Sequence, residues 1–202
     1  EQENIPIHAI SGCSMGAVIG GIYAAGTNLK LLEKLITEIK AKDFFDYGVP
    51  RSGLVRGKRF TELIKMLTKD RDFHELEVPY NCVACDIRAG TTKVFDEGKV
   101  FKAIRASMSI PGIFTPVTLD DVLYVDGGVL DPVPVDAARE FEPDYVIAVD
   151  VGLQSEAEDI NENTWEIMMR TMDLLGFRAK KYETSTADVL INPHVRHTAK
   201  YS

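Results

Sequence analysis

The five residues Gly12-Cys13-Ser14-Met15-Gly16 constrain the fold more than any other stretch of the chain. A short apolar run, residues 7–10, precedes them, and a helical pattern of small residues, 17–25, follows them. A strand, a Gly-x-Ser-x-Gly turn and a helix in this order are the sequence form of a nucleophile elbow. The turn needs small residues such as Gly12 and Gly16, because neighbouring backbone passes close to it. The pattern therefore predicts that Ser14 projects from a strained turn at the end of a sheet.

The same pattern places Ser14 at the N-terminus of a helix. Free backbone N–H groups and the helix dipole favour developing negative charge at such a position. The backbone N–H of Met15, directly after the serine, is the candidate donor to an oxyanion formed there.

Length and composition indicate a globular protein with one core. The chain has 202 residues, of which 45% are hydrophobic and 27% are charged. The net charge of −8 argues against a general nucleic-acid binder, which needs cations to neutralise phosphates. No apolar run reaches the roughly 18 residues of a membrane span. We expect a cytoplasmic protein, with a peripheral position at the membrane as an open alternative.

The chain does not begin with methionine, and residues 1–4 resemble the end of an element that begins upstream. We find no linker and no internal repeat. We therefore expect a single domain over 1–202 that is truncated at its N-terminus. Because no clear element follows residue 191, truncation at the C-terminus is an open alternative.

Cys82 and Cys85 have CxxC spacing, which invites a metal or redox interpretation. They lie, however, in the apolar run 80–87, which has the pattern of a buried strand, and an odd separation puts the two thiols on opposite faces. No second cysteine pair and no histidine accompanies them. We interpret both as core residues in a reducing compartment, and we expect no metal.

The order of elements predicts an α/β fold. Strands are expected at 6–11, 80–87, 91–96, 122–125, 145–151 and 187–191, and the run 145–151 is the clearest buried strand. Helices are expected at 15–25, 28–39, 58–69, 99–107, 135–140 and 163–182. Alternating buried strands and helices indicate a layered fold with a mostly parallel central sheet flanked by helices. Such sheets carry their sites at the carboxyl ends of strands, where Ser14 and Asp126 both fall.

A serine hydroxyl needs a base that takes its proton. None of the four histidines lies in a recognisable motif: His8, His74, His194 and His197. Asp126 is the better candidate, because it directly follows a strand and precedes Gly127 and Gly128, which allow a tight loop. A simple turn after the strand is the alternative interpretation.

The predicted helix 58–69 lies in a basic stretch, residues 51–71. One interpretation is peripheral contact with an anionic membrane surface. The alternative is an ordinary surface helix with a solvated face.

Three blocks, in order, resemble the bacterial patatin-like phospholipase family: residues 5–17 with the elbow, residues 105–116, and residues 124–134 with Asp126-Gly127-Gly128. The resemblance implies a three-layer patatin-like fold and a dyad of Ser14 and Asp126. It implies that Ser14 attacks a fatty-acyl ester with Asp126 as base. The implied reaction requires no cofactor and no metal. It implies phospholipids, lysophospholipids or other acyl esters as substrates. Gly12, Gly16, Gly127 and Gly128 would support the two motifs.

One part of the family pattern is absent from this chain. The family carries a Gly-rich oxyanion loop, Gly-Gly-Gly-x-Arg/Lys-Gly, upstream of the elbow, and Gly20-Gly21 is no substitute. Lost oxyanion donors weaken transition-state stabilisation. The alternative function is therefore a degenerate patatin-like domain that binds lipid or regulates without turnover. The sequence does not give the oligomeric state.

Overall fold

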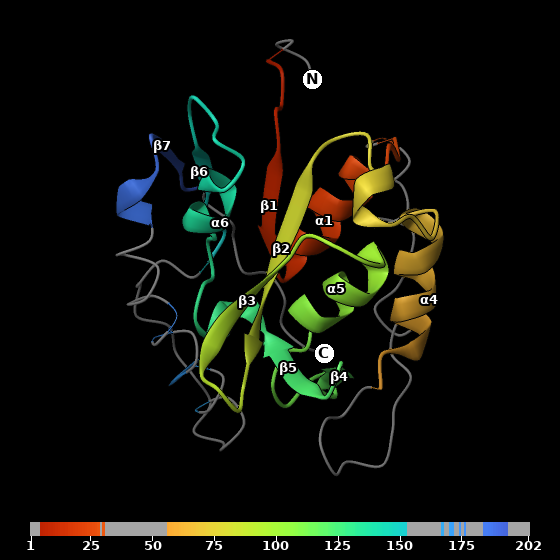
Figure 1. Cartoon of the computed structure of the whole chain (residues 1–202). Helices are drawn as coiled ribbons and strands as arrows, with labels where there is room; N and C mark the ends of the chain where they lie inside the picture. Colours follow the sequence, from red (N-terminus) through yellow and green to blue (C-terminus); the bar gives the residue numbers. More distant parts are fainter. Residues whose placement is uncertain are drawn as a thin grey trace.

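The computed structural model describes residues 5–28, 30, 56–152 and 184–193, together with the single positions 167, 170, 171, 174 and 176. Figure 1 follows the elements along the chain from red to blue. The helices are α1 (Met15–Ala24), α4 (Lys58–Leu67), α5 (Val100–Ser107) and α6 (Val135–Arg139). The strands are β1 (Ile10–Cys13), β2 (Tyr80–Asp86), β3 (Thr91–Phe95), β4 (Val117–Leu119), β5 (Val122–Asp126), β6 (Ile147–Val149) and β7 (Val189–Ile191). Short 3-10 turns of helix lie at Phe73–Glu75, Gly127–Val129 and Thr184–Thr186.

β2 is the central strand of the larger sheet. β1 lies parallel to it, whereas β3 and β5 lie antiparallel to it, and β4 lies antiparallel to β5. β6 and β7 form a separate parallel pair. The expectation of a mostly parallel sheet is therefore wrong for the described residues, where the larger sheet is mixed. The reason is local: short turns join β2 to β3 and β4 to β5, and a short turn connects only antiparallel strands.

Helices cover both faces of this sheet (Figure 1). Side chains alternate across β2, so that Tyr80 and Cys82 pack in the main core with α1, α4 and α5. Val83 points to the opposite face and packs with Ala137 of α6. On that face, Nδ2 of Asn81 donates to the Ala137 carbonyl at 2.8 Å. The expected flanking of the sheet by helices is confirmed.

Apolar side chains at helical spacing form the main core. In α4, Phe60, Ile64 and Leu67 are buried at i, i+4 and i+7, as the sequence pattern predicts. Cys82 is fully buried and Cys85 nearly so, and both thiols are free, which agrees with their interpretation as core residues. Burial raises the pKa of Cys82 to about 12, which keeps this thiol protonated and unreactive.

Two strands differ from the sequence prediction. β1 spans residues 10–13 instead of 6–11, because its pairing with β2 begins at Ile10. β6 is shorter and more exposed than predicted for 145–151: Ala148 is buried, but Ile147 is 52% exposed and Val149 is 54% exposed. Both exposed side chains line a groove beside β1, so only one face of β6 joins the core. The helices predicted at 28–39 and 163–182 lie mostly outside the described residues.

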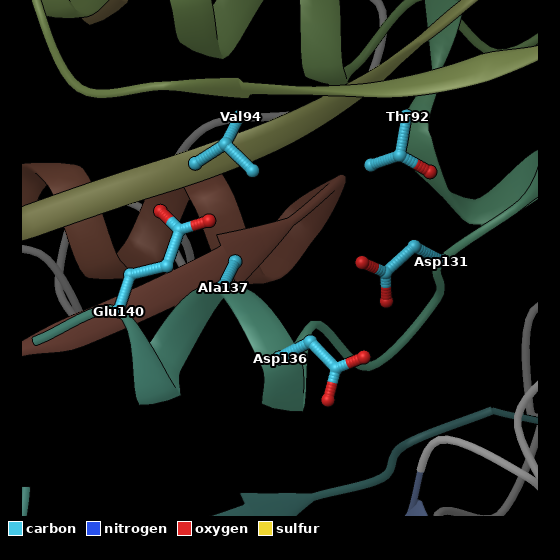
Figure 2. Close-up of a pocket in the computed structure, with 6 residues that line it drawn as sticks. All are labelled: Thr92, Val94, Asp131, Asp136, Ala137 and Glu140. Atoms are coloured by element: carbon cyan, nitrogen blue, oxygen red, sulfur yellow. The ribbon is translucent and has the colours of Figure 1, made fainter. Parts of the chain in front are cut away.

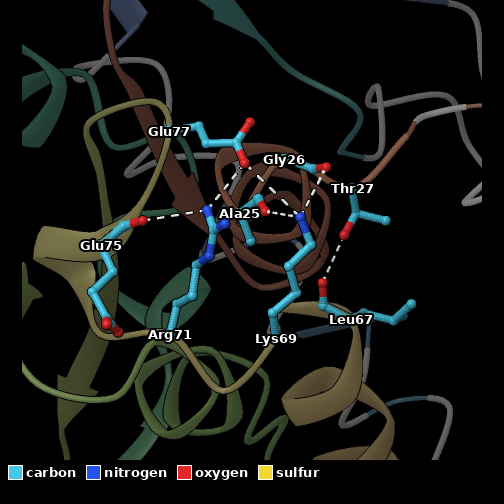
Figure 3. A network of polar contacts seen from close by, with 8 residues as sticks. All are labelled: Ala25, Gly26, Thr27, Leu67, Lys69, Arg71, Glu75 and Glu77. Atoms are coloured by element: carbon cyan, nitrogen blue, oxygen red, sulfur yellow. Dashed lines mark hydrogen bonds and ion pairs between the residues drawn. The ribbon is translucent and has the colours of Figure 1, made fainter.

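Two cations of the predicted basic stretch, Lys69 and Arg71, bind other residues of the protein (Figure 3). Nζ of Lys69 donates to the carbonyls of Ala25 and Gly26 at 2.8 and 3.1 Å, at the end of α1. Nη1 of Arg71 donates to Oε1 of Glu77 at 3.1 Å, and Lys69 lies 3.9 Å from the same carboxylate. Cations at a helix C-terminus satisfy free carbonyls and complement the helix dipole.

These contacts indicate a structural role for Lys69 and Arg71. Arg51, at the start of the basic stretch, lies outside the described residues. Membrane contact by the rest of the basic stretch stays a prediction. None of the helices in the described ranges combines the length and the hydrophobicity that crossing a membrane requires.

Candidate active site

Ser14 lies at the junction of β1 and α1 in a strained backbone conformation. Its φ and ψ are 53° and −121°, a region that residues with a Cβ rarely occupy. The Ser14 carbonyl accepts the N–H groups of Ala17 and Val18 at 3.0 and 3.2 Å, which starts the helix. The chain thus forms a strand, a sharp turn and a helix, with the serine at the turn, as a nucleophile elbow requires.

β1 and β5 approach each other along one edge of β2. β3 pairs with β2 from Cys82 to Asp86, so β1 and β5 must share the opposite edge. β1 ends with Cys13 opposite Val83, and β5, running the other way, ends with Asp126 opposite Ala84. Ser14 and Asp126 meet because two strands end head-on at adjacent positions, and not because parallel strands end at one edge of a sheet.

The side chains of Ser14 and Asp126 are in direct contact. Oγ of Ser14 donates to Oδ2 of Asp126 at 2.6 Å, a short distance for a hydroxyl and a carboxylate. Asp126 is buried, and its Oδ1 accepts the backbone N–H of Gly128 at 2.8 Å. The N–H of Asp126 donates to the carbonyl of Ser109 at 3.0 Å. Both carboxylate oxygens and the backbone of Asp126 are therefore fixed.

Burial changes the acidity of Asp126. Removal from water raises its pKa to about 6, although the hydrogen bonds from Ser14 and from the N–H of Gly128 oppose the rise. At neutral pH the carboxylate is still ionised, and it is a stronger base than an exposed aspartate. A group with a pKa near the working pH is suited to accept a proton and return it.

Two of the four predicted motif glycines are packed against backbone. A Cβ at Gly12 would lie 2.6 Å from Cα of Ala17 and 2.7 Å from the carbonyl oxygen of Gly16. A Cβ at Gly127 would lie 2.5 Å from the carbonyl oxygen of Val83. At Gly128 the nearest atom is Oδ1 of Asp126, at 3.0 Å.

Gly16 differs from these positions, since a Cβ there meets no described atom within 4 Å. The prediction that close packing requires a small residue holds for Gly12, whereas no described residue packs closely against Gly16.

The first N–H groups of α1 are available near Ser14. The N–H of Ser14 itself donates to Oγ of Ser107 at 2.9 Å. The N–H groups of Met15 and Gly16 make no hydrogen bond with the described residues. They are therefore free to bind an anion at the helix N-terminus.

A groove of about 1550 Å³ opens beside Ser14 and Asp126. Its walls include the exposed apolar side chains of Ile5, Ile7, Tyr145, Ile147 and Val149. Ser14 lines this groove, so a molecule within it can reach the hydroxyl.

Neither of the two histidines in the described part of the chain joins the site. His8 is exposed on the approach to β1 and has no hydrogen bond to Ser14 or Asp126, and His74 lies in the 3-10 turn 73–75. His194 and His197 lie outside the described residues.

A smaller hollow of about 260 Å³ lies against α6, and its lining does not include Ser14 (Figure 2). Its lining consists of Thr92, Val94, Asp131, Asp136, Ala137 and Glu140. Despite these carboxylates, no three His, Cys, Asp or Glu side chains in the described part of the chain group closely enough to hold a metal ion.

Sequence reasoning gave no role to three residues that touch the dyad. Ser107 accepts the Ser14 N–H, and Sδ of Met108 lies 3.5 Å from Ser14 Oγ. Sγ of Cys13 lies 4.0 Å from Oδ1 of Asp126. Ser107 and Met108 belong to the block 105–116, where the resemblance was the only available signal.

Comparison with known proteins gives matches over most of the chain. The family model described as Patatin-like phospholipase matches residues 1–139, which include Ser14 and Asp126. An NTE family protein of Mycobacterium tuberculosis is 34% identical over 150 residues, covering 73% of this chain and 42% of that protein. Patatin-like phospholipase domain-containing protein 7 of Rattus norvegicus is 32% identical over 188 residues, covering 87% of this chain and 14% of that protein.

A lysophospholipase of Candida albicans is 29% identical over 168 residues, covering 80% of this chain and 12% of that protein. The chain spans less than half the length of these curated relatives. Among solved structures, VipD from Legionella pneumophila superposes with a TM-score of 0.59 over 88% of this chain and 49% of that chain. The sequence identity to VipD is 12%, so this likeness is one of fold.

Proposed function

Since the chain belongs to the patatin-like phospholipase family, we propose that it is a serine hydrolase that cleaves fatty-acyl esters of phospholipids or lysophospholipids. The observation that carries the proposal is the 2.6 Å hydrogen bond from Ser14 Oγ to Asp126 Oδ2 at a strained elbow. In this role Ser14 is the nucleophile and Asp126 is the general base.

In the first step, Oγ of Ser14 attacks the ester carbonyl carbon while its proton passes to Oδ2 of Asp126. The carbonyl oxygen becomes an oxyanion, and we assign its binding to the N–H groups of Met15 and Gly16 at the start of α1. The tetrahedral intermediate then expels the alcohol. Asp126 returns the proton to that leaving oxygen, and the acyl group stays on Ser14.

In the second step, Asp126 takes a proton from a water molecule that attacks the acyl-serine. The tetrahedral intermediate collapses, the fatty acid leaves, and Ser14 Oγ recovers the proton from Asp126. One carboxylate thus serves both halves of the reaction. Its raised pKa suits this exchange, because the proton must be accepted and released in each half.

The relatives support the substrate class. One is named a lysophospholipase and another contains a patatin-like phospholipase domain by name. We extend a lipid acyl-ester substrate to this chain on that basis, and we place the protein in the cytoplasm with peripheral access to membranes.

The proposal is tested by reacting the purified protein with a fluorophosphonate probe and by measuring fatty-acid release from lysophosphatidylcholine. We expect a single adduct on Ser14 and turnover that Ser14→Ala and Asp126→Asn both abolish. Folded protein that binds lysophospholipid vesicles but gives neither an adduct nor fatty acid would overturn the proposal and support a lipid-binding module.

A further inference from the structure

The end of α5 holds both residues of the dyad through contacts that involve their backbones. Oγ of Ser107, the last residue of α5, accepts the N–H of Ser14 at 2.9 Å. Two residues later, the carbonyl of Ser109 accepts the N–H of Asp126 at 3.0 Å. One short segment therefore sets the positions of two residues that come from different strands.

The Ser107 contact acts at a strained position of the backbone. Ser14 is held at a φ of 53°, which the surrounding structure must enforce. The Ser14 N–H is a main-chain donor through which the end of α5 holds this turn. Ser107 is fully buried, so water does not replace its hydroxyl as the acceptor.

Arg105 makes the segment rigid. Its guanidinium is buried, with Nη1 donating to Ser109 Oγ at 2.7 Å and Nη2 donating to the Thr115 carbonyl at 2.9 Å. The same guanidinium lies over the ring of Phe114, 5.3 Å from its centroid. These contacts fix the turn that follows α5. Ser107 and Ser109, which bind the backbones of Ser14 and Asp126, are therefore held in place.

We propose that Ser107 is a positioning residue of the reaction: its Oγ fixes the Ser14 backbone so that Ser14 Oγ points at both Asp126 and the substrate. Ser107 is not among the hydrogen-bond partners of the Asp126 carboxylate, and it moves no proton. This inference rests on the proposed function of Ser14 as nucleophile. Its consequence is specific, since loss of Ser107 Oγ lowers the rate of the chemical step without changing the base.

Thr68 provides a matched control. It is also fully buried, and its Oγ1 donates to the Ile64 carbonyl at 2.8 Å. It lies beyond the end of α4 and has no hydrogen bond to either dyad residue. Thr68→Val therefore removes one buried hydroxyl, as Ser107→Ala does, without touching the elbow.

The experiment measures Tm, kcat and KM for a short-chain p-nitrophenyl ester, and the rate of Ser14 labelling by a fluorophosphonate, in wild type, Ser107→Ala and Thr68→Val. We expect Ser107→Ala to lower kcat and the labelling rate roughly 10- to 100-fold, because small misplacements of reacting groups cost rates of this size. KM and the pH at half-maximal rate should not change. Thr68→Val should lower Tm about as much as Ser107→Ala does, but it should keep the wild-type kcat.

Wild-type kcat in Ser107→Ala, or equal losses of kcat in both variants, would overturn the positioning role. If Ser107→Ala does not fold, Ser107→Cys, whose side chain is only slightly larger than that of serine, supplies a weaker acceptor at the same position. Its kcat should then lie below that of wild type, and an unchanged value would overturn the role equally. Absence of labelling in wild type would instead contradict the proposed function itself.

Discussion

Ser14 and Asp126 lie 112 positions apart in the sequence, yet the hydroxyl of one donates to the carboxylate of the other at 2.6 Å. β1 and β5 bring them together by running towards each other along one edge of β2. The end of α5 then fixes the backbone of each. Strain at Ser14 and burial of the Asp126 carboxylate both oppose folding. We therefore expect that replacing either residue can raise stability while it lowers activity.

Replacement of Ser14 separates backbone strain from chemistry. Ser14→Gly and Ser14→Ala both remove the nucleophile, so neither should form a probe adduct. Glycine adopts the φ of 53° without a clash of Cβ, whereas alanine does not. We expect the free energy of unfolding of Ser14→Gly to exceed that of Ser14→Ala by about 1 kcal/mol. Urea unfolding of the two variants measures the difference, and equal stability would mean that the elbow stores no strain.

The pH dependence of activity should report Asp126. The ionised carboxylate is needed to accept the Ser14 proton, and burial raises its pKa to about 6. The labelling rate should therefore be low in acid, rise through a midpoint near pH 6 and level off above it. The profile is measured by stopping the fluorophosphonate reaction at fixed times at several pH values on both sides of the midpoint. A rate that stays constant through the midpoint would show that another group is the base.

The same shift predicts how stability depends on pH. The pKa of Asp126 is higher in the folded protein than the ordinary aspartate value of 3.8, so the folded state holds this proton more tightly. Stability should therefore decrease as the pH rises from the pKa of Asp126 in the unfolded chain to its pKa in the folded protein. Above the folded-state pKa the full loss of stability is present. A shift of this size corresponds to about 3 kcal/mol.

Asp126→Asn removes this titration and keeps the side-chain volume. We expect the variant to unfold at a higher Tm than wild type at about pH 8, with the difference shrinking towards about pH 4. Calorimetry at the two pH values measures it. An Asn variant that is less stable than wild type at the higher pH would show that the two hydrogen bonds of the carboxylate outweigh its burial.

The sequence predicts the elements of the site better than the way they meet. Periodicity and apolar runs place α4, α5 and β2 within a few residues, because each buries an amphipathic or apolar run. The turn at Ala89-Gly90 places the start of β3. Strand direction is different: apolar runs such as 80–87 look the same in parallel and antiparallel sheets, so the mixed sheet was missed. Ser14 and Asp126 stand out through their glycine neighbours. Ser107 does not, because a serine at the end of a helix has no pattern that reveals its partner.

Membrane contact by the basic stretch predicts an effect of charge on vesicle binding. Arg59 is exposed on α4, whereas Lys69 and Arg71 are engaged with α1 and Glu77. Arg59→Glu should weaken flotation with anionic vesicles, because cations near the surface attract anionic lipid. Lys93→Glu, on β3, makes the same change in net charge outside the stretch and should float like wild type. Equal flotation of both variants would favour an ordinary surface helix.

The two glycines of the elbow should respond differently to alanine. At Gly12 a methyl group would lie 2.6 Å from Cα of Ala17, a backbone atom that moves only if α1 moves. Gly12→Ala should therefore destabilise the protein by roughly 2 kcal/mol or more and displace Ser14 from Asp126, with loss of labelling. At Gly16 the added methyl meets no described atom within 4 Å, and alanine is favoured in a helix, so Gly16→Ala should be neutral or stabilise by up to about 1 kcal/mol. Urea unfolding and labelling of both variants test the pair. A Gly16→Ala variant as damaged as Gly12→Ala would mean that another part of the protein packs against Gly16.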